Sequence, residues 1–352
     1  MSAHPSTPPV RQIEFCHPET QRAKTRIWPV FLPFHGCPGR CVFCAQEVQT
    51  GTRPRPLATH YRNLEQELEQ ALQNQRAPLE MAFFGGTFTN LPRDWALRFV
   101  ALAQSFRRRS LITRIRCSTR PDSLDQALLQ DLRSEGLDMI ELGIQSFSTA
   151  ALQASQRGYD ADCALEACSR VRRFGFELGV QLMPGLPGQS PSGWHRETTT
   201  LIALGPDCVR LYPCLVFRGT RLAELWHQGR YAPWSVQTTV TALSRTVLAL
   251  WRSGIQVIRT GLPQEQGLLD ELLDGPWHPS LGTMIRSRIL SALLITRALI
   301  LGHGPKTLFC PRKYSGELFG FRGHNRDRLK RHGIVPERTT TWDRSTFLLC
   351  LD

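Results

Sequence analysis

Apolar, β-prone runs alternate with amphipathic stretches along most of the chain. The run IWPVFLPF, from residue 27, precedes the helical pattern LEQELEQALQNQ, and LEMAFFGG precedes DWALRFVALAQSF. Four similar pairs follow: ITRIRCSTRPD with SLDQALLQDLRSEG, DMIELGIQS with DCALEACSRVRRFG, ELGVQLMPGLPG with GWHRETTTLIALG, and DCVRLYPCLVF with a helical stretch over residues 236–253. These patterns predict six strand-then-helix units.

Strands that are joined by helices in this way form a parallel sheet. Six successive units predict an α/β fold, a partial (β/α)6 TIM-like barrel, with its functional residues at the C-terminal ends of the strands. A doubly wound open sheet is the alternative. The alternation fades after Gly261, where we expect a C-terminal α+β extension.

The pattern divides the chain into three parts. Residues 1–26 are expected to form a flexible N-terminal lead-in, residues 27–261 the barrel, and residues 262–352 a basic extension that acts as a substrate-facing cap. The longest apolar stretch, Ile289 to Leu301, is too short to cross a bilayer and contains Arg297. No secretory signal is visible at the start of the chain, so we expect a cytoplasmic protein without a membrane segment.

Composition adds a hypothesis about the partner. Of the 352 residues, 41% are hydrophobic and 21% are charged, which excludes a disordered chain. Lys and Arg number 43 against 30 Asp and Glu, a net charge of +13 that favours polyanions. Residues 311–340 are the most basic stretch, and either a solvated surface or contact with RNA explains them. For RNA, neutralising Arg326, Arg328 and Arg331 is expected to weaken salt-sensitive binding.

Three of the eleven cysteines stand close together after the first strand. Cys37, Cys41 and Cys44 lie in the run CPGRCVFC, and soft thiolates at this spacing select zinc or an iron-sulfur cluster. No fourth cysteine is near, whereas a structural zinc site normally has four protein ligands. A four-iron cluster on three cysteines leaves one iron free for a small molecule. A zinc site that includes His35 is the alternative.

Together with neighbouring motifs, this loop resembles a known family. The cysteine spacing, with Phe43 before the last cysteine, resembles the signature of the radical S-adenosylmethionine enzymes. FFGGTFT, STRPD, ELGIQS, QRGYDAD and MPGLPG follow in order at successive strand ends. Over about residues 27–260 they resemble the branch that contains the catalytic subunit of Elongator and the anaerobic coproporphyrinogen oxidases.

The resemblance implies a cofactor chemistry. Cys37, Cys41 and Cys44 would hold a [4Fe-4S] cluster whose free iron binds S-adenosylmethionine. An electron from a donor such as ferredoxin or flavodoxin would cleave the cofactor to a 5′-deoxyadenosyl radical, which abstracts hydrogen from a substrate. The substrate is not specified by the motifs, and RNA, including tRNA, is the candidate that suits the charge.

The resemblance also assigns roles to residues at the strand ends. Gly85, Gly86 and Thr87 would meet the methionine ammonium group, and Arg157 the carboxylate, which a guanidinium group binds with two prongs. The other expected cofactor contacts are Gln145 at the ribose, Gln181 where relatives have Asp or His, and Phe43 at the adenine. Arg210 and Tyr212, in RLYPCLVF, are the candidate catalytic residues that face the substrate.

The sequence departs from the family branch at several points. Ser118 stands where the Elongator subunit has Glu, and Arg120 is expected to be a structural anchor paired with Asp122. No acetyltransferase domain and no porphyrin substrate are expected. An iron-sulfur electron-transfer or redox-sensing protein, and a nucleic-acid-binding protein with structural zinc, are the competing hypotheses.

Overall fold

The computed structural model describes residues 11–19, 26–262, 264 and 267–352. The chain forms two compact units. One contains residues 20–239 and 253–279, and the other contains residues 240–252 and 280–352 together with the described part of residues 1–19. Much of the expected lead-in, residues 1–10 and 20–25, lies outside the described residues.

The larger unit is built on a curled parallel sheet of seven strands. They follow one another in the sheet in chain order: β2 (Ile27–Phe31), β3 (Leu79–Phe84), β4 (Ile112–Thr119), β5 (Met139–Gln145), β6 (Glu177–Leu182), β7 (Cys208–Leu211) and β9 (Gln256–Thr260). Every neighbouring pair is parallel. Sequential order is the result of barrel winding, whereas a doubly wound sheet reverses its strand order at a switch point. The predicted partial barrel is therefore confirmed.

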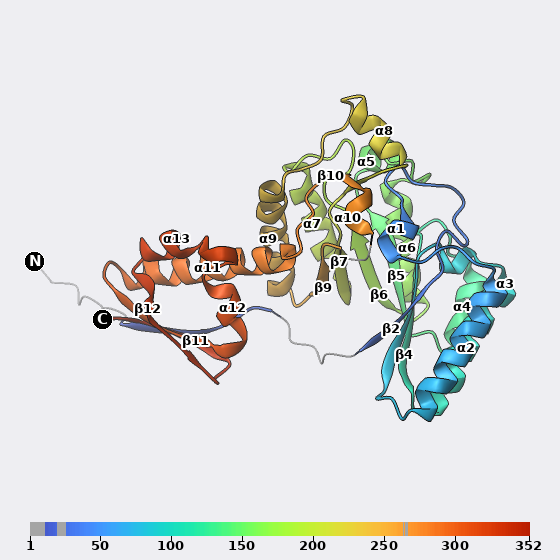
Figure 1. Ribbon diagram of the computed structural model, residues 1–352, viewed down its shortest axis with the longest axis horizontal. Coiled ribbons are helices and arrows are strands. Elements are labelled where there is room, and N and C mark those ends of the chain that lie inside the picture. The colour runs from blue at the N-terminus through green and yellow to red at the C-terminus, as the bar shows by residue number, and fades with distance from the viewer. Residues whose placement is uncertain (1–10, 20–25, 263, 265–266) are drawn as a thin grey trace, which may run out of the picture. The chain divides into compact units, whose positions relative to one another are not determined.

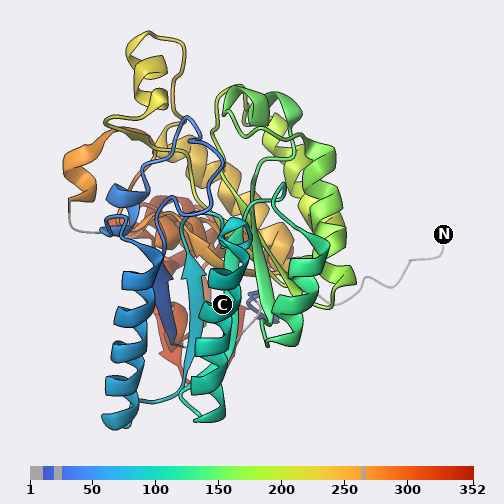
Figure 2. The ribbon, with the colours of Figure 1, turned by 90° about the vertical axis from the view of Figure 1, so that its right-hand side faces the viewer.

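The helices that connect the strands cover the outer face of the sheet (Figures 1 and 2). They are α2 (Leu57–Gln73), α3 (Arg93–Arg108), α4 (Gln126–Ser134), α6 (Ala161–Arg173) and α7 (Gly193–Leu204). Three shorter helices, α1 (Gln46–Thr50), α5 (Thr149–Ala154) and α8 (Arg221–His227), also lie between the strands in sequence, and residues 240–252 of α9 (Val236–Arg252) belong to the smaller unit. A short antiparallel pair, β8 (Val216–Phe217) with β10 (Leu272–Asp274), and α10 (Leu268–Glu271) complete the unit.

Six strand-and-helix units are present, as predicted, but a seventh strand follows them. β9 was missed because QVIRT is a short run of mixed polarity at the edge of the sheet, where no residue of the strand is fully buried. The central strands, in contrast, are almost continuously buried, as expected for a parallel sheet with covered faces.

Short polar residues begin several of these helices at the strand ends. Asp125 accepts a hydrogen bond from the backbone N–H of Leu128, and Asp160 accepts one from Cys163. Such caps satisfy N–H groups that the first helical turn leaves open and contribute about 1 kcal/mol each. They define where the connecting loops end and the helices start.

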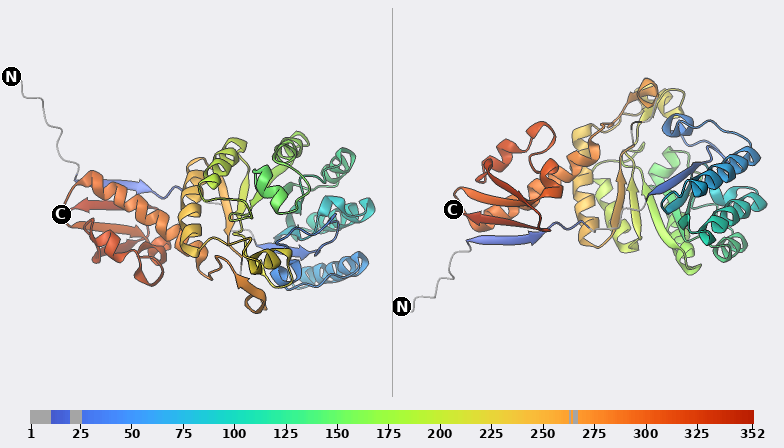
Figure 3. Two further views of the ribbon diagram at one scale, coloured as in Figure 1. Left: turned by 90° about the horizontal axis from the view of Figure 1, so that it is seen from above. Right: turned by 60° about the horizontal axis from the view of Figure 1, so that its bottom comes forward.

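The smaller unit is an α+β structure. Its sheet has the order β1 (Gln12–Cys16), β13 (Thr346–Leu351), β11 (Lys306–Pro311) and β12 (Ile334–Trp342). Three helices, α11 (Leu281–Leu301), α12 (Ser315–Leu318) and α13 (Arg326–Lys330), lie on one side of the strands (Figure 3). The expected helix from Leu281 thus runs to Leu301, and the described end of the lead-in forms a strand. The division of the chain at residues 26 and 261 stays a prediction.

Within the described residues, no helix has the length and apolarity that crossing a membrane requires. Location in the cytoplasm stays a prediction.

The core of the smaller unit depends on aromatic packing between strands that are distant in sequence. Phe347 of β13 is fully buried, stacks on Phe15 of β1 and lies at an angle of 31° to the Tyr314 ring. Replacing Phe347 by Ala removes a large buried ring, and we expect the free energy of unfolding to fall by about 3–5 kcal/mol. Urea unfolding followed by circular dichroism measures this loss.

Leu299→Ala is the matched control because this side chain of α11 is 63% exposed. It is expected to change the free energy of unfolding by less than about 0.5 kcal/mol. Equal losses in the two variants would contradict the proposed aromatic core.

Candidate functional site

A cavity of about 500 Å³ lies at the C-terminal ends of the barrel strands. This volume is within the usual range for small-molecule sites. Eleven of the twelve site residues expected from the sequence line it: Cys37, Cys41, Phe43, Cys44, Gly85, Gly86, Gln145, Arg157, Gln181, Arg210 and Tyr212. The exception is Thr87, which is completely buried behind the cysteine loop.

The cysteine loop and the glycine turn that follows β3 are in direct backbone contact. Gly86 has a φ of +59°, and a Cβ atom built there would lie 2.2 Å from the carbonyl oxygen of His35. Gly36 is equally restricted, because a Cβ atom there would lie 2.3 Å from the carbonyl oxygen of Thr87. Neither position can hold a side chain, so glycine is required on both sides of this contact.

Gln46 connects the same two segments, and sequence analysis missed it. Its Oε1 atom accepts hydrogen bonds from the backbone N–H groups of Phe34, at 2.7 Å, and Gly86, at 2.9 Å. Its Nε2 atom lies 3.5 Å from the Cys44 sulfur. Gln46 follows the last cysteine of the loop by two residues, but nothing in its spacing indicates which backbone groups it would meet.

The three thiols face different neighbours. The Cys37 sulfur is 3.5 Å from the Thr87 hydroxyl oxygen, and the Cys41 sulfur accepts a hydrogen bond from Arg157 at 2.9 Å. In the part of the chain that the structure describes, no three His, Cys, Asp or Glu side chains are arranged as a metal site. The structure therefore brings the three cysteines to one cavity wall without joining their sulfur atoms around a common point.

The protonation state of Cys44 depends on whether this wall holds a metal. Burial, followed by the nearby Cys41 thiol, raises the pKa of Cys44 to about 12, so that its thiolate form is disfavoured in the free chain. A bound metal reverses this preference, because thiolates are the form that ligates metals. The donor set of three thiols on one loop thus suits a soft iron-sulfur group.

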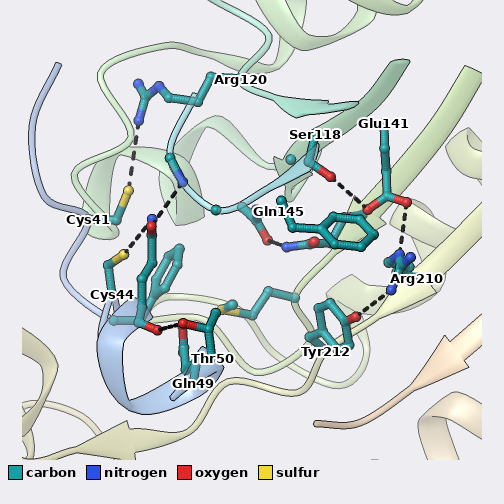
Figure 4. Close-up of a pocket in the computed structure, with 18 of the residues that line it drawn as sticks. Cys41, Cys44, Gln49, Thr50, Ser118, Arg120, Glu141, Gln145, Arg210 and Tyr212 are labelled. Carbon is teal, nitrogen blue, oxygen red and sulfur yellow. Dashed lines mark hydrogen bonds and ion pairs between the residues drawn. The ribbon is translucent and has the colours of Figure 1, made fainter. Parts of the chain in front are cut away.

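Two buried arginines lie beside Cys41. Arg157 is 5% exposed, and it also donates to the carbonyl oxygen of Gly143 at 2.6 Å and to the Tyr159 hydroxyl. Arg120 lies 3.8 Å from the Cys41 sulfur (Figure 4). It pairs with both oxygens of Asp122, as the sequence predicted. Burial alone would lower the pKa of Arg157, but Tyr159 and Cys41 beside it hold this pKa above its ordinary value. Both guanidinium groups therefore stay charged next to the cysteine loop.

Gln145 is held in a conformation that few side chains adopt. It ends β5 with a φ of +72°, next to an irregularity in the pairing with β6, and only 5% of it is exposed. Its Oε1 atom accepts a hydrogen bond from Gln181 Nε2 at 3.2 Å. Left-handed backbone at a buried glutamine stores strain, which is common at binding sites. Gln145, expected at the ribose, and Gln181, expected as a further cofactor contact, are thus adjacent.

The other end of the cavity is a polar cluster around Glu141. Its carboxylate accepts from Arg210 Nε at 2.8 Å and from the Ser118 hydroxyl at 3.3 Å, and Arg210 Nη1 donates to the Tyr212 hydroxyl at 2.9 Å (Figure 4). Glu141 and Arg210 are both buried. Burial opposes the charge of Arg210, but the Glu141 carboxylate outweighs it and raises the pKa of the guanidinium group.

Sequence analysis also missed Glu141 as a partner of Arg210. The two residues are 69 positions apart, on β5 and β7, and only the curl of the sheet brings them together. Ser118, which was noted as a departure, belongs to the same cluster. The two candidate catalytic residues therefore sit at the opposite end of the cavity from the cysteine loop, with their charge balanced.

Comparisons with known proteins agree with this geometry. The family model of the Radical SAM superfamily matches residues 31–196, and that of the Radical SAM C-terminal domain matches residues 206–291. The chain belongs to the Radical SAM superfamily. The matched regions contain every strand of the barrel except part of β2.

Sequence relatives of this superfamily member include tRNA-modifying proteins. A tRNA uridine(34) acetyltransferase of Methanocaldococcus infernus is 25% identical over 290 residues, which are 71% of this chain and 53% of that protein. Elongator complex protein 3 of Mus musculus is 31% identical over 195 residues, 49% of this chain and 35% of that protein. The chain spans about half or less of the length of these two relatives.

Solved structures share the fold of this radical SAM chain. The archaeal Elp3 of Methanocaldococcus infernus, with an N-terminal deletion, has a TM-score of 0.59 and 20% identity, and the match covers 76% of this chain and 63% of that one. Coproporphyrinogen III oxidase from Escherichia coli has a TM-score of 0.50 and 23% identity, with 68% and 54% covered. Both are similar in the barrel architecture.

The bridge formed by Gln46 leads to a prediction about local stability. Gln46→Ala leaves the N–H groups of Phe34 and Gly86 without their acceptor, and each lost bond is worth about 0.5–1.5 kcal/mol. We therefore expect hydrogen exchange at these two amides to accelerate about 3- to 10-fold.

Gln49→Ala is the control, because Gln49 lines the same cavity from α1. In this variant we expect the amides of Phe34 and Gly86 to stay protected from exchange, as measured by NMR. Acceleration of the same size in both variants would refute the bridging role of Gln46.

Proposed function

We propose that the chain is a radical S-adenosylmethionine enzyme that abstracts hydrogen from an RNA substrate. The observation that carries the first part is one cavity that combines three cysteines of a single loop, a glycine turn with no room for side chains, and the buried Arg157. In an unrelated protein, the cysteines, the glycine turn and the arginine would not be expected at successive strand ends in this order.

The position of each residue in the cavity suggests which group it would bind. Cys37, Cys41 and Cys44 would hold a [4Fe-4S] cluster, and Arg157 would bind the carboxylate of S-adenosylmethionine. The cofactor supplies a 5′-deoxyadenosyl radical when an electron from a donor such as ferredoxin or flavodoxin reaches the cluster. The protein's own task is to position both partners and to exclude water.

The remaining assignments follow the cavity wall. The backbone carbonyl oxygens of Gly85 and Gly86 would accept from the methionine ammonium, with Thr87 supporting the loop from behind through Cys37. Gln145 and Gln181 would bind the ribose and Phe43 would pack against the adenine. Arg210 and Tyr212 would then orient the substrate, because Glu141 already holds Arg210 in place.

RNA is proposed as substrate for two reasons. The chain carries a net charge of +13, which attracts phosphates over a distance. Relatives that match most of this chain are named for their action on tRNA. The acetyl transfer in those names is not part of the proposal.

The direct test measures 5′-deoxyadenosine. The chain is reconstituted without oxygen with iron and sulfide, then given S-adenosylmethionine and dithionite, and the nucleoside is quantified by chromatography. We expect its formation in the wild-type chain and its loss in Cys41→Ala, which removes one of the three thiols that would hold the cluster.

Cys163→Ala is the matched control, since this half-buried thiol of α6 lies outside the cavity that holds the cysteine loop. It is expected to retain nucleoside formation. A full cluster without nucleoside, with or without RNA, would instead support an electron-transfer or redox-sensing protein. Zinc in place of iron would support a structural metal site.

A second prediction concerns Arg157. Arg157→Lys keeps the positive charge but loses the two-pronged geometry that suits a carboxylate. We expect the dissociation constant for S-adenosylmethionine to rise about tenfold or more, a change of about 1.4 kcal/mol, while iron content stays unchanged. Equilibrium binding to the reconstituted protein measures this.

Arg170→Lys provides the comparison, because this arginine pairs with Glu166 on the outer helix α6. It should bind S-adenosylmethionine as the wild type does. Unchanged affinity in Arg157→Lys would show that Arg157 does not bind the carboxylate of S-adenosylmethionine.

A further inference from the structure

Two buried polar contacts join three helices of the smaller unit. The Ser244 hydroxyl of α9 donates to the carbonyl oxygen of Val240 in its own helix at 2.6 Å and lies 3.3 Å from the carbonyl oxygen of Ile285 in α11. The Asn325 side chain, just before α13, donates to the hydroxyl of Ser287 at 2.8 Å and to its carbonyl oxygen at 3.2 Å. All four residues belong to one compact unit and are buried. These contacts determine where α9, α11 and α13 approach one another.

An arginine stands beside each of these contacts. Arg245 follows Ser244, Arg288 follows Ser287, and Arg328 lies one helical turn after Asn325. Arg245 is exposed, and Arg288 and Arg328 are half-buried. Burial, and then the positive charges of Arg328 and Arg245, lower the pKa of Arg288, so the three guanidinium groups are close enough to repel one another. We call these three residues the arginine cluster.

Acidic neighbours do not balance this cluster. Among the described residues, no carboxylate forms an ion pair with Arg245, Arg288 or Arg328. The sequence outside the described residues contains a single carboxylate side chain, Glu265.

Three other arginines of this unit do have carboxylate partners. Arg286, two residues before Arg288, bonds to Glu19 and Glu317, while Arg312 pairs with Asp343 and Arg338 with Asp352. Like charges that are held together destabilise a fold unless an anion joins them. Exposed Arg326, Lys330 and Arg331 on and after α13 extend the same charge outward.

We propose that the arginine cluster binds the phosphodiester backbone of a folded RNA substrate. Guanidinium groups bind phosphate oxygens with paired N–H donors, and three of them on separate helices suit successive phosphates better than one small anion. Such contacts position a nucleic acid without selecting its sequence. This inference rests on the proposed function, because it takes its ligand from the proposed substrate.

The arrangement also refines the interpretation of the basic stretch. Sequence analysis considered Arg326, Arg328 and Arg331 alone, within residues 311–340. The structure adds Arg245 and Arg288, which come from helices 83 and 40 residues earlier than Arg328 in the chain. Contact with RNA is thereby assigned to a surface formed by three helices.

The test compares two triple variants of the full chain that remove the same charge. One is Arg245→Gln, Arg288→Gln and Arg328→Gln; the control is Arg312→Gln, Arg338→Gln and Arg344→Gln, three exposed arginines from other parts of the same unit. Binding of a fluorescent tRNA transcript is measured by anisotropy at several salt concentrations. We expect the slope of log affinity against log salt to fall by about 2–3 in the cluster variant and by less than about 1 in the control.

Equal losses in the two variants would overturn the assignment, because they would reflect net charge alone. Unchanged binding in the cluster variant would overturn it as well. A third variant with lysine at the three cluster positions guards against misfolding: retained salt slope with weaker binding supports the proposal. Tighter binding to phosphatidylserine vesicles than to tRNA in the wild type, lost in the cluster variant, would identify a lipid surface instead of RNA.

The two proposals fail in distinguishable ways. A wild-type chain that binds tRNA through the cluster but forms no 5′-deoxyadenosine refutes the radical chemistry and retains the phosphate site. A wild-type chain that forms 5′-deoxyadenosine while the cluster variant binds tRNA normally refutes the phosphate site and retains the chemistry.

Discussion

The close contact between the cysteine loop and the glycine turn after β3 is the constraint on which the rest of the site depends. In each segment a carbonyl oxygen lies against a glycine of the other segment. The Gln46 side chain also joins the segments, because it accepts a hydrogen bond from one backbone N–H group of each. Because neither glycine has a Cβ, the loop can lie directly over the strand ends. The cysteines therefore face the cavity, while a larger residue at Gly36 or Gly86 would lift the loop away from it.

A second constraint is the charge inside the barrel. Arg120, Arg157 and Arg210 are each less than 8% exposed, and a buried guanidinium group is tolerated only with partners. Arg210 has the carboxylate of Glu141, whereas Arg157 has a carbonyl oxygen, a phenol and a thiol. Of these three arginines, Arg157 is the one that bonds to no carboxylate of the described residues, which suits it to an anionic ligand. The two ends of the cavity differ in this respect: a carboxylate neutralises Arg210 at one end, whereas the charge of Arg157 at the other end can be neutralised by a bound anion.

The alternation of strands and helices was sufficient to predict the barrel, because each unit is local in sequence and its period is visible over ten or more residues. β9 escaped prediction because this edge strand is only partly buried and its polarity is mixed. Cavity-lining residues were predictable where a motif marked them, as at Gly85, Gly86 and Arg157. Glu141 and Gln46 were not, since their roles come from contacts with backbone or side chains that the sequence does not place near them.

β1 illustrates the same limit on a larger scale. Gln12 pairs with Cys350 across nearly the whole length of the chain, so the first described strand completes a sheet made from the last fifty residues. A five-residue run beside a proline-rich start resembles an unstructured lead-in, and only the exposed edge of β13 gives it a partner. Closing so long a loop costs only slightly more entropy than closing a short one, because this cost grows with the logarithm of its length. The pairing therefore needs no more than a modest gain from Phe15 stacking on Phe347. It joins the two ends of the chain in the unit that also carries the arginine cluster, so the folding of that surface depends on residues from both ends.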